Sequence, residues 1–153
     1  LDPMAAYLLL RGMKTLHLRI RQQNASALRI ARYLQDHPAV SRVFYPGLES
    51  NEHYNLACQQ MRGFGGMLSF ALHAGLEAVH AFVPRLHYAR RAANLGAVET
   101  VVGVPATTSH VESSAQERAA MGIPESLIRY SVGIEEPDDL IADLAQAFAQ
   151  IKA

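Results

Sequence analysis

The sequence predicts an α/β fold, a small two-layer domain in which helices cover one face of a mostly antiparallel sheet. Amphipathic helices are predicted at both ends of the chain, and short strands alternate with short helices between them. Half of the 153 residues are hydrophobic, which is enough apolar material for one well-filled core. We therefore expect residues 1–153 to form one domain.

The first predicted element is a long helix over residues 4–35. Its apolar residues recur at steps of three, four or seven and form one stripe: Leu9, Met13, Leu16, Ile20, Ala27, Ala31 and Leu34. Gly12 interrupts the pattern, so a bend or two separate helices are expected. His37 and Pro38 end the helix, because the residue before a proline is disfavoured in the α region.

The middle of the chain combines strands and short helices. Strands are predicted over residues 40–45 and 67–72 and, more weakly, over residues 87–93 and 99–102. A helix over residues 51–61 is expected to be capped by Ser50 or Asn51, and residues 76–83 form a second helix. Ser114 and Glu117 have the spacing of a capping box, which predicts a third helix that ends at Gly122.

The end of the chain is predicted as a strand followed by a helix. Along residues 127–132, Ile128, Tyr130 and Val132 point to one face of the sheet. The final helix begins at Pro137, and acidic residues in and before its first turn complement the helix dipole. Its core stripe consists of Leu140, Ile141, Leu144, Phe148 and Ile151.

Charge and hydropathy exclude two classes of partner. Basic and acidic residues number 14 each, so the chain lacks the positive excess that binding to nucleic acid requires. The sequence also lacks the long apolar run of a membrane-spanning helix. We therefore expect neither nucleic acid nor a membrane as a partner.

The histidines and the single cysteine indicate no metal centre and a cytoplasmic location. None of the seven histidines has a second histidine or a cysteine two to four residues away, as metal ligands often do. Cys58 cannot form an internal disulfide, and its place within a predicted helix favours an inert, buried thiol. Residues 1–4 show no signal peptide.

Two short patterns could bind an anion, but each has a simpler explanation. Gly63, Gly65 and Gly66 precede a strand, whereas phosphate-binding glycines follow a strand and open a helix, so a turn is favoured. Arg90 and Arg91 could hold an anion, although a solvated pair is the favoured interpretation.

Arg129 is the charged residue whose position demands an explanation. An arginine in the middle of a strand needs either a partner for its charge or access to water. A carboxylate is the natural partner, because the guanidinium fork makes two parallel hydrogen bonds to it. The alternative is an arginine on the solvent side of a half-exposed sheet, and spacing alone favours this alternative.

Four motifs in order carry a family resemblance: YLLLRGMKTL at residues 7–16, GFGGM at 63–67, PATTSH at 105–110 and LIRYSVGIE at 127–135. Together they resemble the C-terminal domain of the Cys/Met-metabolism enzymes that depend on pyridoxal phosphate. Cystathionine γ-synthase, cystathionine γ-lyase and methionine γ-lyase belong to this family. The resemblance covers nearly the whole chain and implies the C-terminal domain of a fold-type I enzyme, with residues 1–36 as a long connecting helix region.

The resemblance implies that pyridoxal phosphate is bound mainly by a larger N-terminal domain, which carries the Schiff-base lysine. Neither Lys14 nor Lys152 matches the motif of that lysine. We therefore expect this chain alone to be inactive and to associate with such a domain. The enzymes of the family are tetramers, so the resemblance also implies a homo-oligomer.

The resemblance assigns substrate-binding residues one by one. Arg129 matches the arginine that binds the substrate α-carboxylate, which reverses the interpretation from spacing. Asn94 falls where the family usually has serine, near the substrate. Ser109 falls where many members have threonine, and Val104 replaces a histidine that is often present.

Ala93 bears on the choice of substrate. Cystathionine-processing lyases often have glutamate at this position, which suits a distal amino group, whereas methionine γ-lyases have an apolar residue. An alanine leaves a distal ammonium without a charge partner, so Ala93 favours γ-elimination on methionine or a related thioether. The alternatives are γ-replacement as in cystathionine γ-synthase, a cystathionine lyase, or an isolated non-catalytic domain with a binding or assembly role.

Overall fold

A five-stranded sheet forms the centre of the structure, a computed structural model that describes residues 1–151. Across the sheet the strands are ordered β1 (Val40–Phe44), β2 (Met67–Leu72), β5 (Leu127–Ser131), β4 (Val101–Gly103) and β3 (Arg90–Arg91). Strands β3 and β4 are parallel, and the other neighbouring pairs are antiparallel. The predicted, mostly antiparallel sheet is therefore confirmed.

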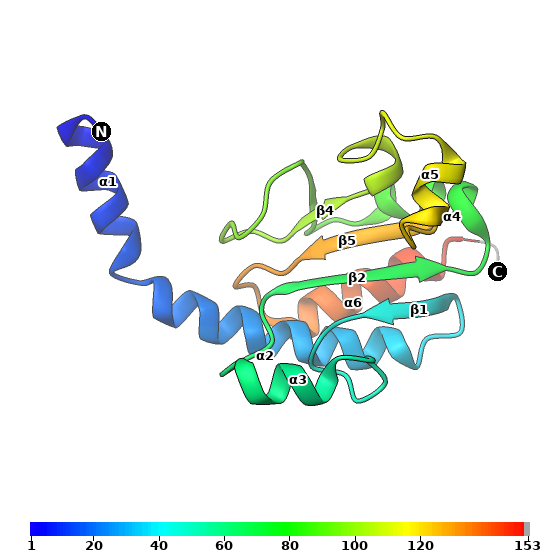
Figure 1. The fold of residues 1–153 in the computed structure, drawn as a ribbon, viewed down its shortest axis with the longest axis horizontal. Coiled ribbons are helices and arrows are strands. Elements are labelled where there is room, and N and C mark those ends of the chain that lie inside the picture. Colours follow the sequence, from blue (N-terminus) through cyan, green and yellow to red (C-terminus); the bar gives the residue numbers. More distant parts are fainter. Residues whose placement is uncertain (152–153) are drawn as a thin grey trace.

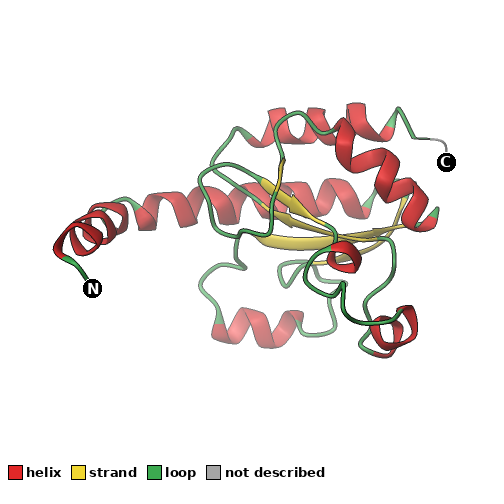
Figure 2. Cartoon of the chain, turned by 90° about the horizontal axis from the view of Figure 1, so that it is seen from above, coloured by secondary structure: helices red, strands yellow, loops and turns green. Residues whose placement is uncertain are grey.

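The long helices cover one face of this sheet, and the other face is largely open (Figures 1 and 2). The α-helices are α1 (Pro3–Met13), α2 (Leu16–Gln35), α3 (Tyr54–Gln60), α4 (Gly75–Phe82), α5 (Ala115–Ala120) and α6 (Pro137–Phe148). Two short 3-10 helices are η1 (Val83–Arg85) and η2 (Pro105–Thr107). Helices α2, α4 and α6 lie on the covered face, whereas the short helices α3 and α5 lie on the opposite side, toward the rim (Figure 2).

The core lies between the sheet and helices α2, α4 and α6. The alternation predicted for β5 is confirmed, because Ile128 and Tyr130 are fully buried and Arg129 is half-buried. From α6, Leu140 and Leu144 are fully buried against the same layer. No helix within residues 1–151 is long and apolar enough to cross a lipid bilayer.

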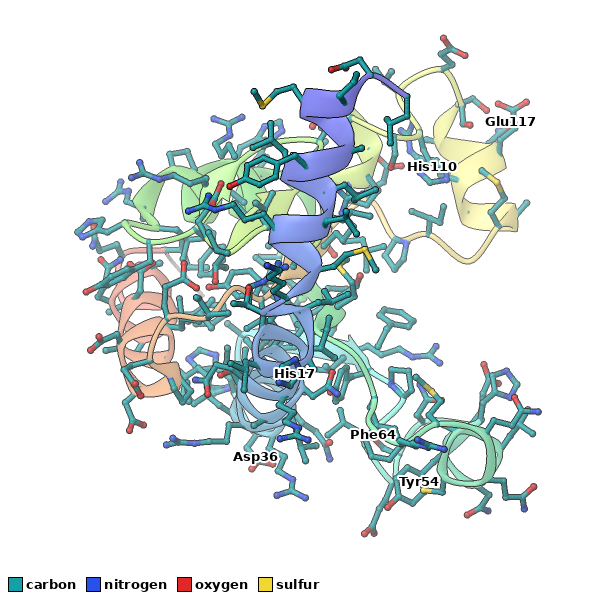
Figure 3. The ribbon with its side chains drawn as sticks, turned by 90° about the vertical axis from the view of Figure 1, so that its left-hand side faces the viewer. His17, Asp36, Tyr54, Phe64, His110 and Glu117 are labelled. Atoms are coloured by element: carbon teal, nitrogen blue, oxygen red, sulfur yellow. The ribbon has the colours of Figure 1, made fainter. Side chains whose placement is uncertain are left out.

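The predicted N-terminal helix is two helices, as the interruption at Gly12 indicated. The break falls at Lys14 and Thr15, between α1 and α2. Only the second half of the predicted apolar stripe is buried: Ala27, Ala31 and Leu34. Helix α1 projects from the body of the molecule (Figures 1 and 3), and none of its residues is buried.

Helix α3 corrects two expectations. It begins at Tyr54, later than predicted, because the side chain of Asn51 accepts a hydrogen bond from the backbone N–H of His53 and forms a turn. Cys58 is exposed, so the expectation of a buried thiol was wrong. The helix is short and rests on the rim of the domain, where only Ala57 is buried.

The two weakly predicted strands are shorter than expected. Strand β3 contains only Arg90–Arg91, because the backbone N–H groups of His87 and Tyr88 are bound by the buried carboxylate of Asp143 in α6. Strand β4 begins at Val101, two residues later than predicted. The side chain of Asp143, which is distant in sequence, therefore limits the length of β3.

The glycine segment of residues 63–66 is a turn packed against α2, as its order relative to β2 predicted. A Cβ atom on Gly66 would lie 2.9 Å from the Cβ of Gln23, so a side chain would collide with the helix. The hydroxyl of Tyr45 donates to the carbonyl of Gly65 at 2.9 Å, and burial raises the pKa of this tyrosine to about 12. Figure 3 shows Phe64 beside Tyr54 of α3, with ring centroids 6.0 Å apart.

Candidate functional site

Arg129 lies in the middle of β5 on the face that the long helices leave open. Its neighbours in register are Ser69 of β2 and Gly103 of β4. Ile128 and Tyr130 on either side point into the core, so the alternation of the strand directs Arg129 away from it. Strand register therefore places a guanidinium near the centre of the open face.

Gly103 allows the guanidinium of Arg129 to lie over the neighbouring strand. A Cβ atom on this glycine would lie 3.3 Å from Nη2 of Arg129 and 3.6 Å from the carbonyl oxygen of Ala92. Glycine within a strand often marks such a close approach, and this signal was present in the sequence. Sequence reasoning missed Gly103 as a site residue.

The charge of Arg129 has no protein counterion in the described part of the chain. The ion pairs within residues 1–151 join other side chains: Arg29 with Asp138, His53 with Glu52, and Arg118 with Glu125. Partial burial of a charged side chain costs free energy, and an anion that forms hydrogen bonds with it offsets this cost. The guanidinium of Arg129 is therefore available to an anionic ligand.

A hollow of about 290 Å³ lies at the edge of the sheet where β3 ends; Gly103 is among its lining residues, and Arg129 is not. It is lined by Val83, Arg91, Ala92, Ala93, Val102, Gly103, Val104, Thr107 and Thr108. The hydroxyls of both threonines donate to the carbonyl of Val104, at 3.3 and 2.8 Å. The hollow is thus mainly apolar, and none of its lining side chains is a carboxylate.

The structure brings some of the predicted site residues together and leaves others apart. Ala93 lines the same hollow as Gly103, over which Arg129 lies. Asn94 is exposed, and its side chain accepts a hydrogen bond from the backbone N–H of Leu95 at 2.8 Å. Ser109 is also exposed, with Oγ 2.9 Å from Nδ1 of His110. Neither side chain is among those that line the hollow.

The loop that carries Asn94 is fastened to the end of β5. The backbone N–H of Gly96 donates to Oγ of Ser131 at 3.1 Å. The carboxylate of Glu135 accepts from the backbone N–H and the hydroxyl of Thr100, at 2.6 and 2.8 Å. Sequence reasoning assigned Glu135 only to the dipole of the last helix. Its position shows that it orders the loop beside the hollow.

The two lysines of the chain lie away from Arg129 or outside the described residues. Lys14 is exposed at the end of α1, on the projecting arm away from the sheet (Figure 1). Lys152 lies outside the described residues. Within residues 1–151, no group of three or more His, Cys, Asp or Glu side chains is arranged to hold a metal ion.

Comparison with known proteins places this site in a family. Residues 1–149 match the model of the Cys/Met metabolism PLP-dependent enzymes. Cystathionine gamma-synthase 1, a chloroplastic protein of Nicotiana tabacum, is 46% identical over 99% of this chain and 28% of its own length. L-methionine gamma-lyase of Treponema denticola is 42% identical over 99% of this chain and 38% of its own length.

A solved structure gives the same result for the fold. Cystathionine gamma-lyase from Lactobacillus plantarum, complexed with L-serine, superposes with a TM-score of 0.92 at 43% identity, over 99% of this chain and 39% of that one. The chain thus spans between about a quarter and two fifths of the length of these relatives. Since the family model matches almost the whole chain, the chain belongs to the pyridoxal-phosphate-dependent enzymes of cysteine and methionine metabolism.

Proposed function

We propose that this chain is the substrate-carboxylate-binding part of a pyridoxal-phosphate enzyme that acts at the γ-carbon of a sulfur amino acid. One observation carries the proposal: Arg129 presents a guanidinium without a counterion among residues 1–151, on the open face of the sheet and over Gly103. The guanidinium fork makes two parallel hydrogen bonds to a carboxylate, which fixes the orientation of the amino acid.

Asn94 and Ser109 are proposed as additional polar contacts to the substrate. Both side chains are exposed and now hydrogen-bond to adjacent residues, so each can exchange a local partner for a ligand at small cost. Ala93 is proposed to contact the substrate side chain, because it lines the same hollow as Gly103, over which the guanidinium of Arg129 lies.

We propose that residues 1–153 form the C-terminal domain of the enzyme, with residues 1–36 connecting it to further polypeptide. Pyridoxal phosphate, when bound, supplies an electron sink for the reaction, and the further polypeptide is proposed to hold most of it. The chain alone is then inactive. Its exposed α1 has no buried residue and carries large apolar side chains, which suits packing on such a domain or in a homotetramer. A cytoplasmic location remains our prediction.

The first candidate reaction is γ-elimination on methionine or a related thioether, in which methionine and water give methanethiol, 2-oxobutanoate and ammonia. Ala93 supports it, because the hollow offers no carboxylate to a distal ammonium such as that of cystathionine. The second candidate is γ-replacement, in which cysteine displaces the γ-substituent of an activated homoserine and cystathionine forms. The similarity to cystathionine gamma-synthase 1 of Nicotiana tabacum supports this second candidate.

The test is an assay of the complete, cofactor-loaded enzyme with L-methionine, L-cystathionine and O-acetyl-L-homoserine, the last in the presence of cysteine. Formation of 2-oxobutanoate reports elimination, and formation of cystathionine reports replacement. We expect turnover of methionine or of the homoserine ester to exceed that of cystathionine. Absence of turnover with all three would refute the proposed function and favour a non-catalytic domain.

A further inference from the structure

Glu135 is a half-buried carboxylate that has no role in the proposed function. Its Oε1 accepts a hydrogen bond from the backbone N–H of Thr100 at 2.6 Å, and its Oε2 accepts one from the hydroxyl of the same threonine at 2.8 Å. That hydroxyl accepts a hydrogen bond from the backbone N–H of Gly133 at 2.9 Å, so its own proton points to the carboxylate. Both donors of Thr100, which is fully buried, are therefore satisfied by one side chain.

Gly133 provides the space for this contact. A Cβ atom on it would lie 2.6 Å from the backbone nitrogen of Thr100 and would overlap the carboxylate of Glu135. Beside it, the backbone N–H of Ile134 donates to the carbonyl of Val98 at 2.8 Å. The segment before β4 is thus bound closely to the segment that follows β5, and the carboxylate of Glu135 is the side chain that joins them.

These contacts fix one end of the loop of residues 92–99, which lies over the face of the sheet that carries Arg129. The backbone N–H of Gly96 donates to Oγ of Ser131 at 3.1 Å. Ser131 and Arg129 are alternate residues of β5, so they point to the same face. Asn94 precedes the attached glycine by two residues and is therefore held near the guanidinium by the loop.

The side chain of Asn94 does not hold the loop in place. It is exposed, and its hydrogen bond to the backbone N–H of Leu95 joins two adjacent residues of the same loop. The attachments to other elements lie further along, where Nε2 of Gln23 donates to the carbonyl of Ala97 at 3.0 Å and Glu135 binds Thr100. The position of Asn94 relative to β5 therefore depends on residues 96–100.

We propose that Glu135 is a positioning residue for substrate binding. By binding Thr100, its carboxylate holds the loop of residues 92–99 so that Asn94 reaches the α-carboxylate that Arg129 binds. The inference rests on the proposed function, in which Asn94 and Arg129 contact the substrate. Glu135 acts through Asn94 and does not itself touch the substrate.

The first experiment measures whether Glu135 orders the loop. Hydrogen exchange of the complete holoenzyme, followed by mass spectrometry, gives the exchange rate of peptides that contain residues 94–100. We expect Glu135→Ala to raise this rate about tenfold or more, because the amide of Thr100 loses its acceptor. Glu135→Gln keeps one acceptor oxygen and should have a smaller effect. It also carries the comparison if the alanine variant does not fold.

Glu99→Ala is the matched control for hydrogen exchange. Glu99 is an exposed carboxylate in the same loop, adjacent to Thr100, so its replacement removes the same charge without removing the contact. It should leave the exchange rate unchanged. An unchanged rate in both Glu135 variants would overturn the inference.

The second experiment measures whether the ordered loop matters for the substrate carboxylate. L-norleucine and 1-aminopentane differ only in the α-carboxylate, and titration calorimetry of the holoenzyme gives their Kd. We expect Glu135→Ala to raise Kd about tenfold for norleucine and less than about twofold for aminopentane, with a smaller rise in Glu135→Gln. In an Asn94→Ala background, the same substitution should change the Kd of norleucine by less than about twofold, because the contact through which it acts is already lost.

Ser126→Ala is the control for stability. It removes a buried hydrogen bond to the carbonyl of Leu72 at the other end of β5, so it destabilises the domain away from the loop. It should change neither Kd. Equal weakening of both ligands in Glu135→Ala, or additive effects of Glu135 and Asn94, would show that Glu135 is merely structural and would overturn the inference.

Arg129→Ala distinguishes a failure of this inference from a failure of the proposed function. If Arg129→Ala weakens the binding of norleucine and the Glu135 variants do not, only the inference fails. If norleucine does not bind, or binds equally well without Arg129, the proposed carboxylate site fails and the inference fails with it. Dependence of norleucine binding on both residues supports the inference, whichever reaction the enzyme catalyses.

Discussion

Replacing Arg129 by alanine separates a binding role from a structural one. Its guanidinium has no protein counterion within residues 1–151 and lies on the open face of the sheet. The substitution therefore removes the contact between the Arg129 side chain and Gly103. It leaves no protein carboxylate within residues 1–151 without its ion-pair partner. We expect unfolding free energy to change by about 0.5 kcal/mol, or roughly 2 °C in Tm for a domain of this size.

The expected effect on substrate binding is much larger. Losing a bidentate pair with a carboxylate in a closed site costs about 2–5 kcal/mol, because the substrate carboxylate is left unpaired. This range corresponds to a fall in kcat/KM of about 30-fold to 5,000-fold. Arg129→Lys should recover only part of the loss, because an ammonium is a point charge and cannot reproduce the fork.

The assay is steady-state kinetics of the complete holoenzyme alongside thermal unfolding of the same variants. Arg42→Ala is the control, because this arginine lies on the edge strand β1 with its guanidinium 4.7 Å from the ring centroid of Phe44. It should leave kcat/KM unchanged. A value of kcat/KM within a few-fold of wild type for Arg129→Ala, together with a collapse in Tm, would show that Arg129 is structural.

Three further predictions concern stability and association. Gly133→Ala should lower stability by more than about 2 kcal/mol in thermal unfolding, because a Cβ there would overlap a backbone carbonyl oxygen, whereas Gly12→Ala has open space and should not. Burial lowers the pKa of His37, whose ring stacks on Phe148, so stability should be full above pH 6.5 and decline below it. His37→Asn should remove this decline in a series of Tm measurements; an unchanged decline would exclude His37 as its source. Leu10→Ser on the exposed α1 should reduce self-association of the isolated chain in analytical sedimentation. The proposed contact would be contradicted if the variant associates as strongly as the wild type, or if the wild type is already monomeric.

Most elements of the fold could be predicted from the sequence because they depend on local patterns. Strand β2 was predicted with its observed bounds, and the alternation of β5 correctly separated Ile128 and Tyr130 from Arg129. The capping box of Ser114 and Glu117 forms as predicted, because both partners lie within one turn of the helix. Ordered motifs also indicated the family, which the match over residues 1–149 shows.

The tertiary structure decided features that depend on residues distant in sequence. Strand β3 is short because Asp143, more than fifty residues away, binds the preceding backbone. The role of Gly103 depends on the strand paired beside it, since only that register brings the guanidinium of Arg129 over the glycine. Arg90 and Arg91 are both exposed, as expected of a solvated pair, but only packing decides that Arg91 lies beside α4 and η1. The alternation of residues along a strand determines the face of the sheet to which a side chain points. The residues that surround this side chain depend on how the strands and helices pack together, and the candidate site consists of residues brought together in this way.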